Sequence, residues 1–301
     1  MAEAEERTAG TECSNDATDS NIKASDKLES VISISRFDYS APSSLLRHSR
    51  SGFLVTCPIK REKSATKEAI SILQQFTGSD HVPHAQGNSK RMKTLNTLHT
   101  DANKDGGFAL SLLKLSKNGL VLIIFPPESL HDTIDLLSHV FTSLEHGSLK
   151  PPLWCNRLLP IQATCSLEEK EIYPAVHKLV LHFVTEKQRH LPTPLRFAIS
   201  YNRRGLEEMS TSLGNDSEAR ALLDKATCYN TVAAAVQDAI ADSAVDLTSP
   251  DMIIALELLP LRGVPTGSIV AAISVLPRDL VIVKPRLVVK PVGQKAGPTK
   301  N

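Results

Sequence analysis

The hydrophobic residues of this chain fall into short runs and longer stripes, and the two patterns predict alternating strands and helices. Short apolar runs bounded by turn residues predict strands, and apolar residues three and four apart predict helices with one buried face. The first half predicts a strand at 53–57, a helix at 64–76, and strands at 108–115 and 120–125 that flank the hairpin turn Asn118-Gly119. A second helix follows, which ends at Gly147, and then a strand from Trp154 to Pro160. The apolar face of this second helix consists of Leu130, Ile134, Leu137, Phe141 and Leu144. This β-α-β-β-α-β order is the split βαβ, ferredoxin-like arrangement, in which four antiparallel strands carry both helices on one face.

The second half predicts an α/β unit whose strands are joined by helices. A helix is expected from Ser166 to about Thr185, with Pro174 in its third turn. It is followed by a strand at 195–202, a helix at 217–241, a turn at 245–250, strands at 252–259 and 269–276, and a last strand at 280–289 interrupted by Pro285. The predicted fold class is therefore α/β (α+β overall).

Composition divides the chain into four parts. Residues 1–49 are small and polar and predict a disordered tail. Residues 50–149 form the ferredoxin-like domain, whose last strand extends to 160 in the alternative interpretation, and residues 150–283 form the second domain. Residues 284–301 are interpreted as a basic C-terminal tail, because lysine and arginine occur there without an acid.

Charge and cysteine content exclude several classes of protein. The 301 residues carry a formal net charge of +1, which neither indicates nor excludes a basic binding face. No apolar run approaches the roughly 18–20 residues that span a bilayer, so no membrane partner is expected. The five cysteines are too scattered for a zinc knuckle, and their odd number, with no signal peptide, indicates a reducing compartment.

Motifs of catalysis are absent from the sequence. There is no G-x-S-x-G elbow, Walker loop or H-E-x-x-H helix, so we expect no enzyme activity, no cofactor and no metal. His81 and His84 lack supporting ligands, and His177 and His182 are expected on different helix faces. Asp246 and Glu257 are interpreted as a turn-forming aspartate and a strand-edge glutamate rather than as an acid and a base.

The stretch from Trp154 to Cys165 predicts a basic strand that leads into a helix. Pro160 ends or edges the strand because it removes a ladder donor. Ser166 and Glu169 have the spacing of a capping box, which places a helix start directly afterwards. The positive end of that helix beside Arg157 would suit a phosphate, although most arginines on strands are simply solvated.

Basic residues from several segments form a candidate RNA-binding face. Its members are Arg157, Lys187, Arg189, Arg196, Asn202, Arg203 and Arg204. Aromatic residues make up only 4% of the chain, so such a face would contact phosphates rather than stack on bases. The alternative is that these are ordinary surface side chains.

The same stretches resemble the stand-alone THUMP-domain proteins that act as tRNA-binding adaptors of an RNA cytidine acetyltransferase. The resemblance covers about residues 52–283, with gaps. It is carried by Gly52 to Cys57, Arg157-Leu-Leu-Pro160, Thr164-Cys165, Tyr201-Asn202-Arg203, Val245-Asp246-Leu247 with Pro250, and Ser274-Val275. It implies a ferredoxin-like domain followed by an α/β THUMP domain, with Pro160, Thr164, Cys165, Ser166 and Glu169 as its structural motif.

The resemblance also implies a function. Arg157, Asn202, Arg203 and Arg204 would contact RNA, and the protein would present serine- or leucine-type tRNA to a separate acetyltransferase that forms N4-acetylcytidine in the D-arm. Nucleus or nucleolus is the implied location, with cytoplasm as the alternative. The acidic turn at Glu207 and Glu208 departs from the family. It favours a second hypothesis, a structural or assembly protein that kept the fold and lost RNA binding; a cryptic enzyme is the third.

Overall fold

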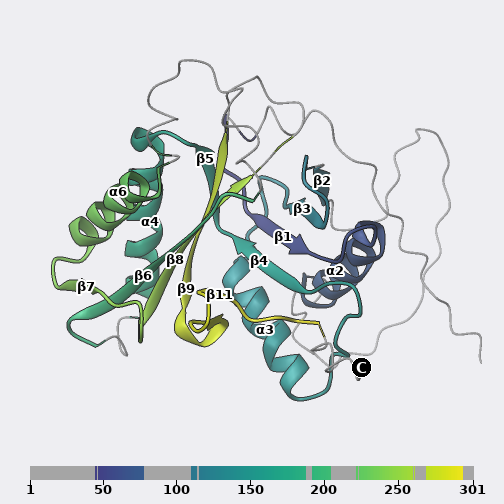
Figure 1. Cartoon of the computed structure of the whole chain (residues 1–301). Helices are drawn as coiled ribbons and strands as arrows, with labels where there is room; N and C mark the ends of the chain where they lie inside the picture. Colours follow the sequence, from purple (N-terminus) through teal and green to yellow (C-terminus); the bar gives the residue numbers. More distant parts are fainter. Residues whose placement is uncertain are drawn as a thin grey trace, which may run out of the picture. The chain divides into compact units, whose positions relative to one another are not determined.

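The computed structural model describes residues 45, 47–77, 110–113, 115–187, 192–204, 222, 224–259, 261 and 269–293. All of these residues belong to one compact unit, and its elements are drawn in Figure 1. Most of the predicted tail at 1–49 and the loop with His81 and His84 lie outside the described residues. Within the described part, helices alternate with two main sheets, which confirms the predicted α/β class.

The first sheet has the predicted ferredoxin-like topology. Its strands are β1 (Gly52–Thr56), β2 (Ser111–Leu113), β3 (Leu120–Ile124) and β4 (Arg157–Ile161). They lie in the order β2-β3-β1-β4, and every neighbouring pair is antiparallel. Helices α2 (Glu62–Thr77) and α3 (Thr133–Glu145) contact each other and the sheet (Figure 1). Phe53, Leu54 and Val55 of the central strand are fully buried, so both faces of this sheet are covered.

The second sheet is mixed and has five strands. These are β5 (Ala163–Ser166), β6 (Leu195–Asn202), β7 (Ser243–Val245), β8 (Met252–Leu259) and β9 (Val270–Pro277), in the order β5-β9-β8-β6-β7. Strand β6 is parallel to β7 and β8, whereas β9 is antiparallel to β8 and β5. Helices α4 (Glu169–Lys187) and α6 (Lys225–Ala239) pack side by side on it, and their apolar stripes share one buried core with its strands (Figure 1). Of the predicted helix at 217–241, Leu222 and the residues of α6 are described as helical.

The two sheets meet where β4 passes into β5. Gln162, which separates these strands, donates its backbone N–H to Ile273 O at 3.0 Å and accepts from Val275 N–H through its side-chain oxygen at 2.8 Å. The buried Ser274 hydroxyl donates to Pro160 O. The first sheet therefore ends, and the second begins, at Gln162. The predicted boundary between domains at 149/150 stays a prediction.

Two elements begin later than the sequence pattern indicates. Leu130 was expected on the apolar stripe of α3, but the helix starts at Thr133 because the Asp132 carboxylate caps it, accepting from Ile134 N–H at 2.6 Å. Leu130 precedes the helix and is 99% exposed. The strand expected from Trp154 starts at Arg157, because the preceding N–H groups donate to the Glu68 carboxylate at 2.8–3.1 Å; these belong to Leu153, Trp154 and Cys155.

The predicted capping box at Ser166 and Glu169 is wrong. Ser166 lies in β5, where it is paired with Val270, and α4 begins at Glu169. The first helical hydrogen bond at this end runs from Ile172 N–H to Glu168 O at 2.9 Å. Pairing with β9 continues the extended backbone past the serine, so a local capping signal is overridden by the sheet.

Both ends of the compact part reach further than predicted. Leu45 is buried, and the Ser49 hydroxyl accepts from Thr164 N–H at 3.2 Å, so the end of the predicted N-terminal tail belongs to the fold. After the short helix η2 (Arg278–Leu280), strands β10 (Val281–Ile282) and β11 (Val288–Val289) pair with each other. Further along, the Val292 N–H donates to Asn156 O at 2.9 Å. Residues 287–293 are therefore packed rather than a tail, because the buried Val289 and Val292 lie among them, whereas residues 284–286 are exposed.

None of the described helices is long and apolar enough to cross a membrane.

Candidate nucleic-acid interface

A groove of about 630 Å³ lies between the hairpin turn that joins β2 to β3 and the end of β6. The residues that line it come from both halves of the compact unit and from the start of α6; they are Lys117, Asn118, Leu120, Tyr201, Asn202, Arg203, Arg204 and Lys225. Four of these carry a positive charge, and no described lining residue is acidic. We refer to this set as the basic groove.

The hairpin side of the basic groove is held by hydrogen bonds on both sides of its glycine. Gly119 has φ +77°, a left-handed conformation that glycine adopts without strain. Its N–H donates to the Glu62 carboxylate at 2.8 Å, and its carbonyl accepts from Cys57 N–H at 2.9 Å. The turn therefore presents the exposed side chains of Lys117 and Asn118 from a fixed backbone.

The opposite side of the groove is the end of β6, which is fixed by a buried carboxylate. Arg204 has φ +49°, a conformation that costs a non-glycine residue about 1–2 kcal/mol. Its Nε donates to Glu257 in the neighbouring strand β8, and Asn202 Nδ2 donates to the other carboxylate oxygen at 2.9 Å. Glu257 is 7% exposed, so this pairing is shielded from water. The carboxylate therefore stabilises the strained turn that carries Arg203.

Burial raises the pKa of the Glu257 carboxyl, whereas the Arg204 guanidinium and the Asn202 amide act in the opposite direction. An arginine in direct hydrogen-bond contact favours the ionised carboxylate. The charge of Arg204 is therefore largely balanced by Glu257, and this arginine mainly shapes the groove. The other positive charges that line the groove belong to Lys117, Arg203 and Lys225.

Tyr201, which lines the groove, packs against Tyr229 between β6 and α6. The Tyr201 hydroxyl donates to Leu222 O at 3.3 Å, and the Tyr229 hydroxyl donates to Ile199 O at 3.1 Å, with the rings edge to face. Burial raises the pKa of Tyr201, while a hydrogen bond with Arg203 lowers it. Lys225 Nζ lies 5.1 Å from the centre of the Tyr229 ring. These rings lie beside two of the cations, so the groove is not purely a charged surface.

Lys225 is the first residue of α6, and the helix start adds partial positive charge to this side of the groove. The Asp224 carboxylate caps the helix by accepting from Thr227 N–H at 2.9 Å. That hydrogen bond holds the pKa of Asp224 below its usual range, so the aspartate is charged and partly offsets the cations beside it. The groove is thus basic, with one acid at its edge.

The structure brings together three of the seven predicted RNA-binding residues: Asn202, Arg203 and Arg204. Arg157 lies elsewhere, at the start of β4, where its Nε donates to Val289 O at 3.1 Å. Strands β4 and β5 separate it from the start of α4, so the expected phosphate site between this arginine and that helix end is not formed.

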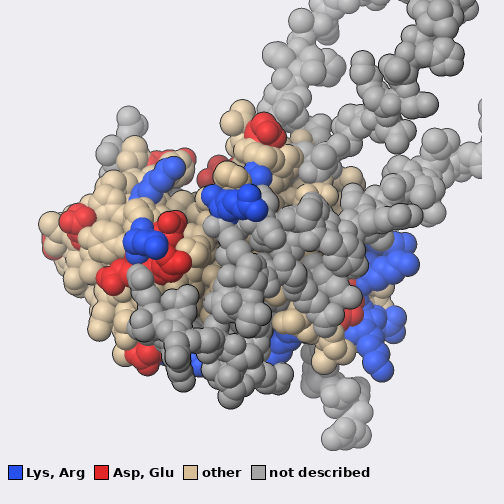
Figure 2. All heavy atoms as spheres, turned by 90° about the horizontal axis from the view of Figure 1, so that it is seen from above, with Lys and Arg blue, Asp and Glu red and all other residues tan. Residues whose placement is uncertain are grey.

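Arg196 lies at the opposite end of β6 from the groove. Its guanidinium makes a bidentate pair with Asp251, with contacts of 2.9 and 2.8 Å, and Asp246 is 3.9 Å away. Such a pair stabilises this end of β6 rather than attracting a phosphate. Lys187 ends α4, but its side chain and Arg189 lie outside the described residues. The expectation of a single continuous basic face is therefore not met by the described residues. In Figure 2 the blue side chains of the visible face form separate groups, some beside red ones.

The motif residues at the entry to the second sheet have structural contacts. Pro160 accepts from Ser274 through its carbonyl, and the Thr164 hydroxyl accepts from Arg50 N–H at 3.0 Å. Cys165 is buried, and burial raises the pKa of its thiol to about 12. Burial likewise raises the thiol pKa of Cys57 to about 11 and of Cys228 to about 12. Thiols in this state are packing residues and not nucleophiles.

Of the two acids considered in the sequence, Asp246 forms the predicted turn, accepting from Thr248 and Ser249 N–H at 2.7 and 3.0 Å. Glu257 is not on a strand edge, because β8 is a central strand with β6 and β9 on either side. Lys117 and Lys225 were missed by sequence reasoning. The Asn118-Gly119 turn is a local signal that could have pointed to Lys117. Asp224 could have marked a helix start before Lys225, but the predicted helix at 217–241 runs through it.

No protein-family model and no curated protein matches the chain. Among solved structures, it is similar to PH1313 from Pyrococcus horikoshii Ot3, with 10% sequence identity and a TM-score of 0.39 over 75% of this chain and 55% of that one. It is also similar to a 4-thiouridine synthetase in complex with RNA and ATP, with 11% identity and a TM-score of 0.34 over 76% of this chain and 42% of that one. The chain thus spans about half the length of these two proteins.

Proposed function

We propose that this protein is a non-catalytic tRNA-binding adaptor that presents serine- or leucine-type tRNA to a separate RNA cytidine acetyltransferase for N4-acetylcytidine formation in the D-arm. The observation that carries tRNA binding is the basic groove, where cations from both halves of the compact unit face one space without an acidic lining residue among those described. The acetyltransferase, the choice of tRNA and a nuclear or nucleolar location come from the sequence resemblance to THUMP adaptors.

The chemistry of the groove favours a phosphate backbone over a free nucleotide. Lys117, Arg203 and Lys225 come from three separate segments, so they match negative charges spread along a chain better than one compact phosphate group. The exposed amide of Asn118 can donate to phosphate or sugar oxygens, and the tyrosine hydroxyls are already occupied by backbone carbonyls. Binding through this groove is therefore expected to follow the shape of the RNA more than its sequence.

The test is binding of the full-length protein to a leucine or serine tRNA and to a duplex RNA of equal length, across a salt series. Affinity should be higher for tRNA and should fall as salt rises, because each neutralised phosphate releases counterions. The triple variant Lys117→Ala/Arg203→Ala/Lys225→Ala should weaken binding at least about tenfold and reduce the salt slope by about two to three, close to one per lost contact.

Arg196→Ala is the matched control, because this arginine lies on the same strand as the groove residues but is paired with Asp251 at the other end. It should leave the affinity and the salt slope unchanged. Equal loss in the control and the triple variant would show that binding is generic, and unchanged binding in the triple variant would remove the groove from the proposal. Acetylation of the tRNA by a cytidine acetyltransferase, with and without this protein, then tests the adaptor role.

The second candidate is a structural or assembly protein that kept the fold and lost RNA binding. It is favoured by the neutralisation of Arg196 and Arg204 by carboxylates and by the net charge of only +1. Equal, weak and salt-insensitive binding of tRNA and duplex RNA would support it over the adaptor.

A further inference from the structure

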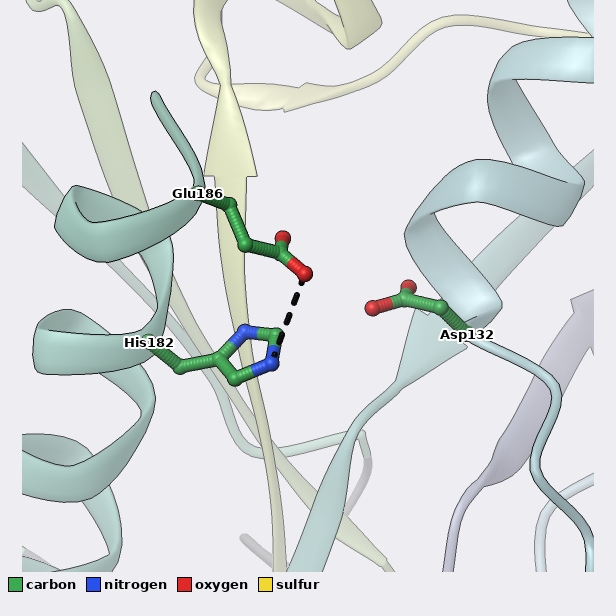
Figure 3. A group of neighbouring side chains, drawn as sticks. All are labelled: Asp132, His182 and Glu186. Carbon is green, nitrogen blue, oxygen red and sulfur yellow. Dashed lines mark ion pairs between the residues drawn. The ribbon is translucent and has the colours of Figure 1, made fainter. Parts of the chain in front are cut away.

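Three side chains that can bind a metal converge between α3 and α4, away from the basic groove. Asp132 precedes the first residue of α3, whereas His182 and Glu186 lie one turn apart on α4. One ligand atom from each lies within 4.8 Å of the other two. Figure 3 shows the imidazole and both carboxylates directed toward the same space, from two elements that are distant in the sequence.

Each of the three is held in position by its element. Residues four apart on a helix share a face, and His182 Nε2 lies 3.4 Å from Glu186 Oε1. Asp132 Oδ1 accepts from Ile134 N–H at 2.6 Å and from Asp135 N–H at 3.3 Å, which fixes the plane of the carboxylate. The capping role uses Oδ1, so Oδ2 is the atom that Asp132 offers to a ligand.

The spacing matches the requirements of zinc. Zinc–nitrogen and zinc–oxygen bonds of about 2.0–2.2 Å place neighbouring ligand atoms of a tetrahedral site about 3.3 Å apart. The distance of 3.4 Å between His182 and Glu186 already has this value. Asp132 lies within the 4.8 Å limit, and side-chain rotation of the exposed His182 and Glu186 covers the remaining difference.

The surroundings leave room for the fourth ligand. The three residues line an open groove of about 500 Å³, which also carries Ser51, Ser129, His131, Asp135, Gln162 and Lys178. Water therefore reaches the position that three protein ligands leave open, as in zinc sites with an exchangeable ligand. Lys178 is the one cation among the lining residues described, against three carboxylates, so a divalent cation is favoured over an anion.

We propose that Asp132, His182 and Glu186 bind one zinc ion, with water as the fourth ligand. An imidazole with two carboxylates suits a first-row divalent metal, whereas magnesium and calcium prefer sites made only of oxygen. Because Asp132 belongs to the ferredoxin-like half and the other two to α4, the ion would fasten the start of α3 to the second half. This proposal does not depend on RNA binding.

His177 provides a matched control on the same helix. It lies 3.3 Å from the Asp238 carboxylate, so it makes a histidine–carboxylate pair like that of His182, but no third ligand completes a site around it among the described residues. If an ordinary surface ion pair accounts for the geometry at His182, the two histidines should behave alike. If zinc binding accounts for it, only His182 should matter.

The experiment is calorimetric titration of the metal-free full-length protein with zinc chloride, for the wild type, His182→Ala, Asp132→Asn and His177→Ala. Other histidines and cysteines of the chain can also bind zinc. The readout is therefore the number of zinc equivalents that a variant loses relative to the wild type. His182→Ala and Asp132→Asn should each lose one equivalent, or weaken it by more than the roughly 10–100-fold that an outer-sphere partner costs. His177→Ala should retain it.

Unfolding provides a second readout. Zinc at a hundredfold excess over Kd should raise Tm by about 5–10 °C in the wild type and in His177→Ala but not in His182→Ala. Asparagine at position 132 keeps the helix cap, so Asp132→Asn should fold with an unchanged circular dichroism spectrum. Equal zinc binding by wild type and His182→Ala would overturn the proposal, and so would magnesium binding as tightly as zinc at this site.

Discussion

Two carboxylates place the basic side chains of β6: Glu257 lies in the neighbouring strand β8, and Asp251 directly precedes that strand. Glu257 is buried and holds Asn202 and Arg204 at one end of that strand, where the backbone turns into the groove. Asp251 holds Arg196 at the other end, accepting from its backbone N–H at 3.1 Å as well as from its guanidinium. Each acid therefore pairs with one arginine of this strand region and holds it against the sheet.

Asp251 should make stability depend on pH in the acid range. The hydrogen bonds from the Arg196 side chain hold the pKa of Asp251 below its usual range. A carboxyl with a lowered folded-state pKa contributes stability above the unfolded value of about 3.9, and this contribution is lost as pH falls through the folded value. Urea unfolding should therefore find Asp251→Asn less stable than the wild type at pH 6, with the difference shrinking below about pH 4.

The exposed Asp279 provides the control for this measurement. Asp279→Asn should change the free energy of unfolding by less than about 0.5 kcal/mol at pH 6. A difference for Asp251→Asn that stays constant between pH 6 and pH 3 would contradict the assigned pairing.

At the scale of the element, α3 shows how a cap decides which leucines of an apolar stripe are buried. The stripe starts at Leu130, but the Asp132 cap starts the helix at Thr133, three residues later. Leu137 lies inside the helix and is fully buried, whereas Leu130 lies before it and is almost fully exposed. The same residue type therefore contributes very differently to stability at two positions in one predicted stripe.

The two leucines make a direct comparison. Leu137→Ala should destabilise the protein by about 2–5 kcal/mol, since it removes buried methyl groups and leaves a cavity. Leu130→Ala should change the free energy of unfolding by less than about 0.5 kcal/mol. Urea denaturation of both variants checks this, and a comparable loss in Leu130→Ala would mean that this side chain is covered by another part of the protein.

At the scale of the whole molecule, hydrogen bonds around Gln162 link the two sheets. Pro160, Gln162 and their partners on β9 are linked by hydrogen bonds that include the buried Ser274 hydroxyl. Trp154, in the segment held by Glu68, is the only tryptophan of the chain, and it contacts Arg61, whose guanidinium carbon lies 4.1 Å from the ring centre. Its fluorescence therefore reports on the first half alone.

Unfolding should be a single cooperative transition. Tryptophan fluorescence, which reports on the first half, and far-UV circular dichroism, which reports on both, should give the same midpoint in urea, because neither sheet can separate without exposing the junction. Ser274→Ala leaves the Pro160 carbonyl without its buried donor and should lower stability by about 1–3 kcal/mol. Two separated midpoints in the wild type would show instead that the halves unfold independently.

The sequence by itself determined the element order and the ferredoxin-like topology of the first half, because strand and helix periods are local and the Asn118-Gly119 turn fixes its hairpin. It also located Asn202, Arg203 and Arg204 at the end of β6, since polar residues follow an alternating strand there.

Only the tertiary structure decided which charges share a site. Lys117 and Lys225 join Arg203 because the hairpin turn and the start of α6 meet at the end of β6, and Asp132 reaches His182 and Glu186 because α3 begins opposite α4. The same contacts pair Arg196 with Asp251 and place Ser166 in a strand instead of a helix cap. Local patterns specify elements, whereas the partners of a charged or capping side chain come from segments far away in the sequence, so pairing and burial are decided by packing.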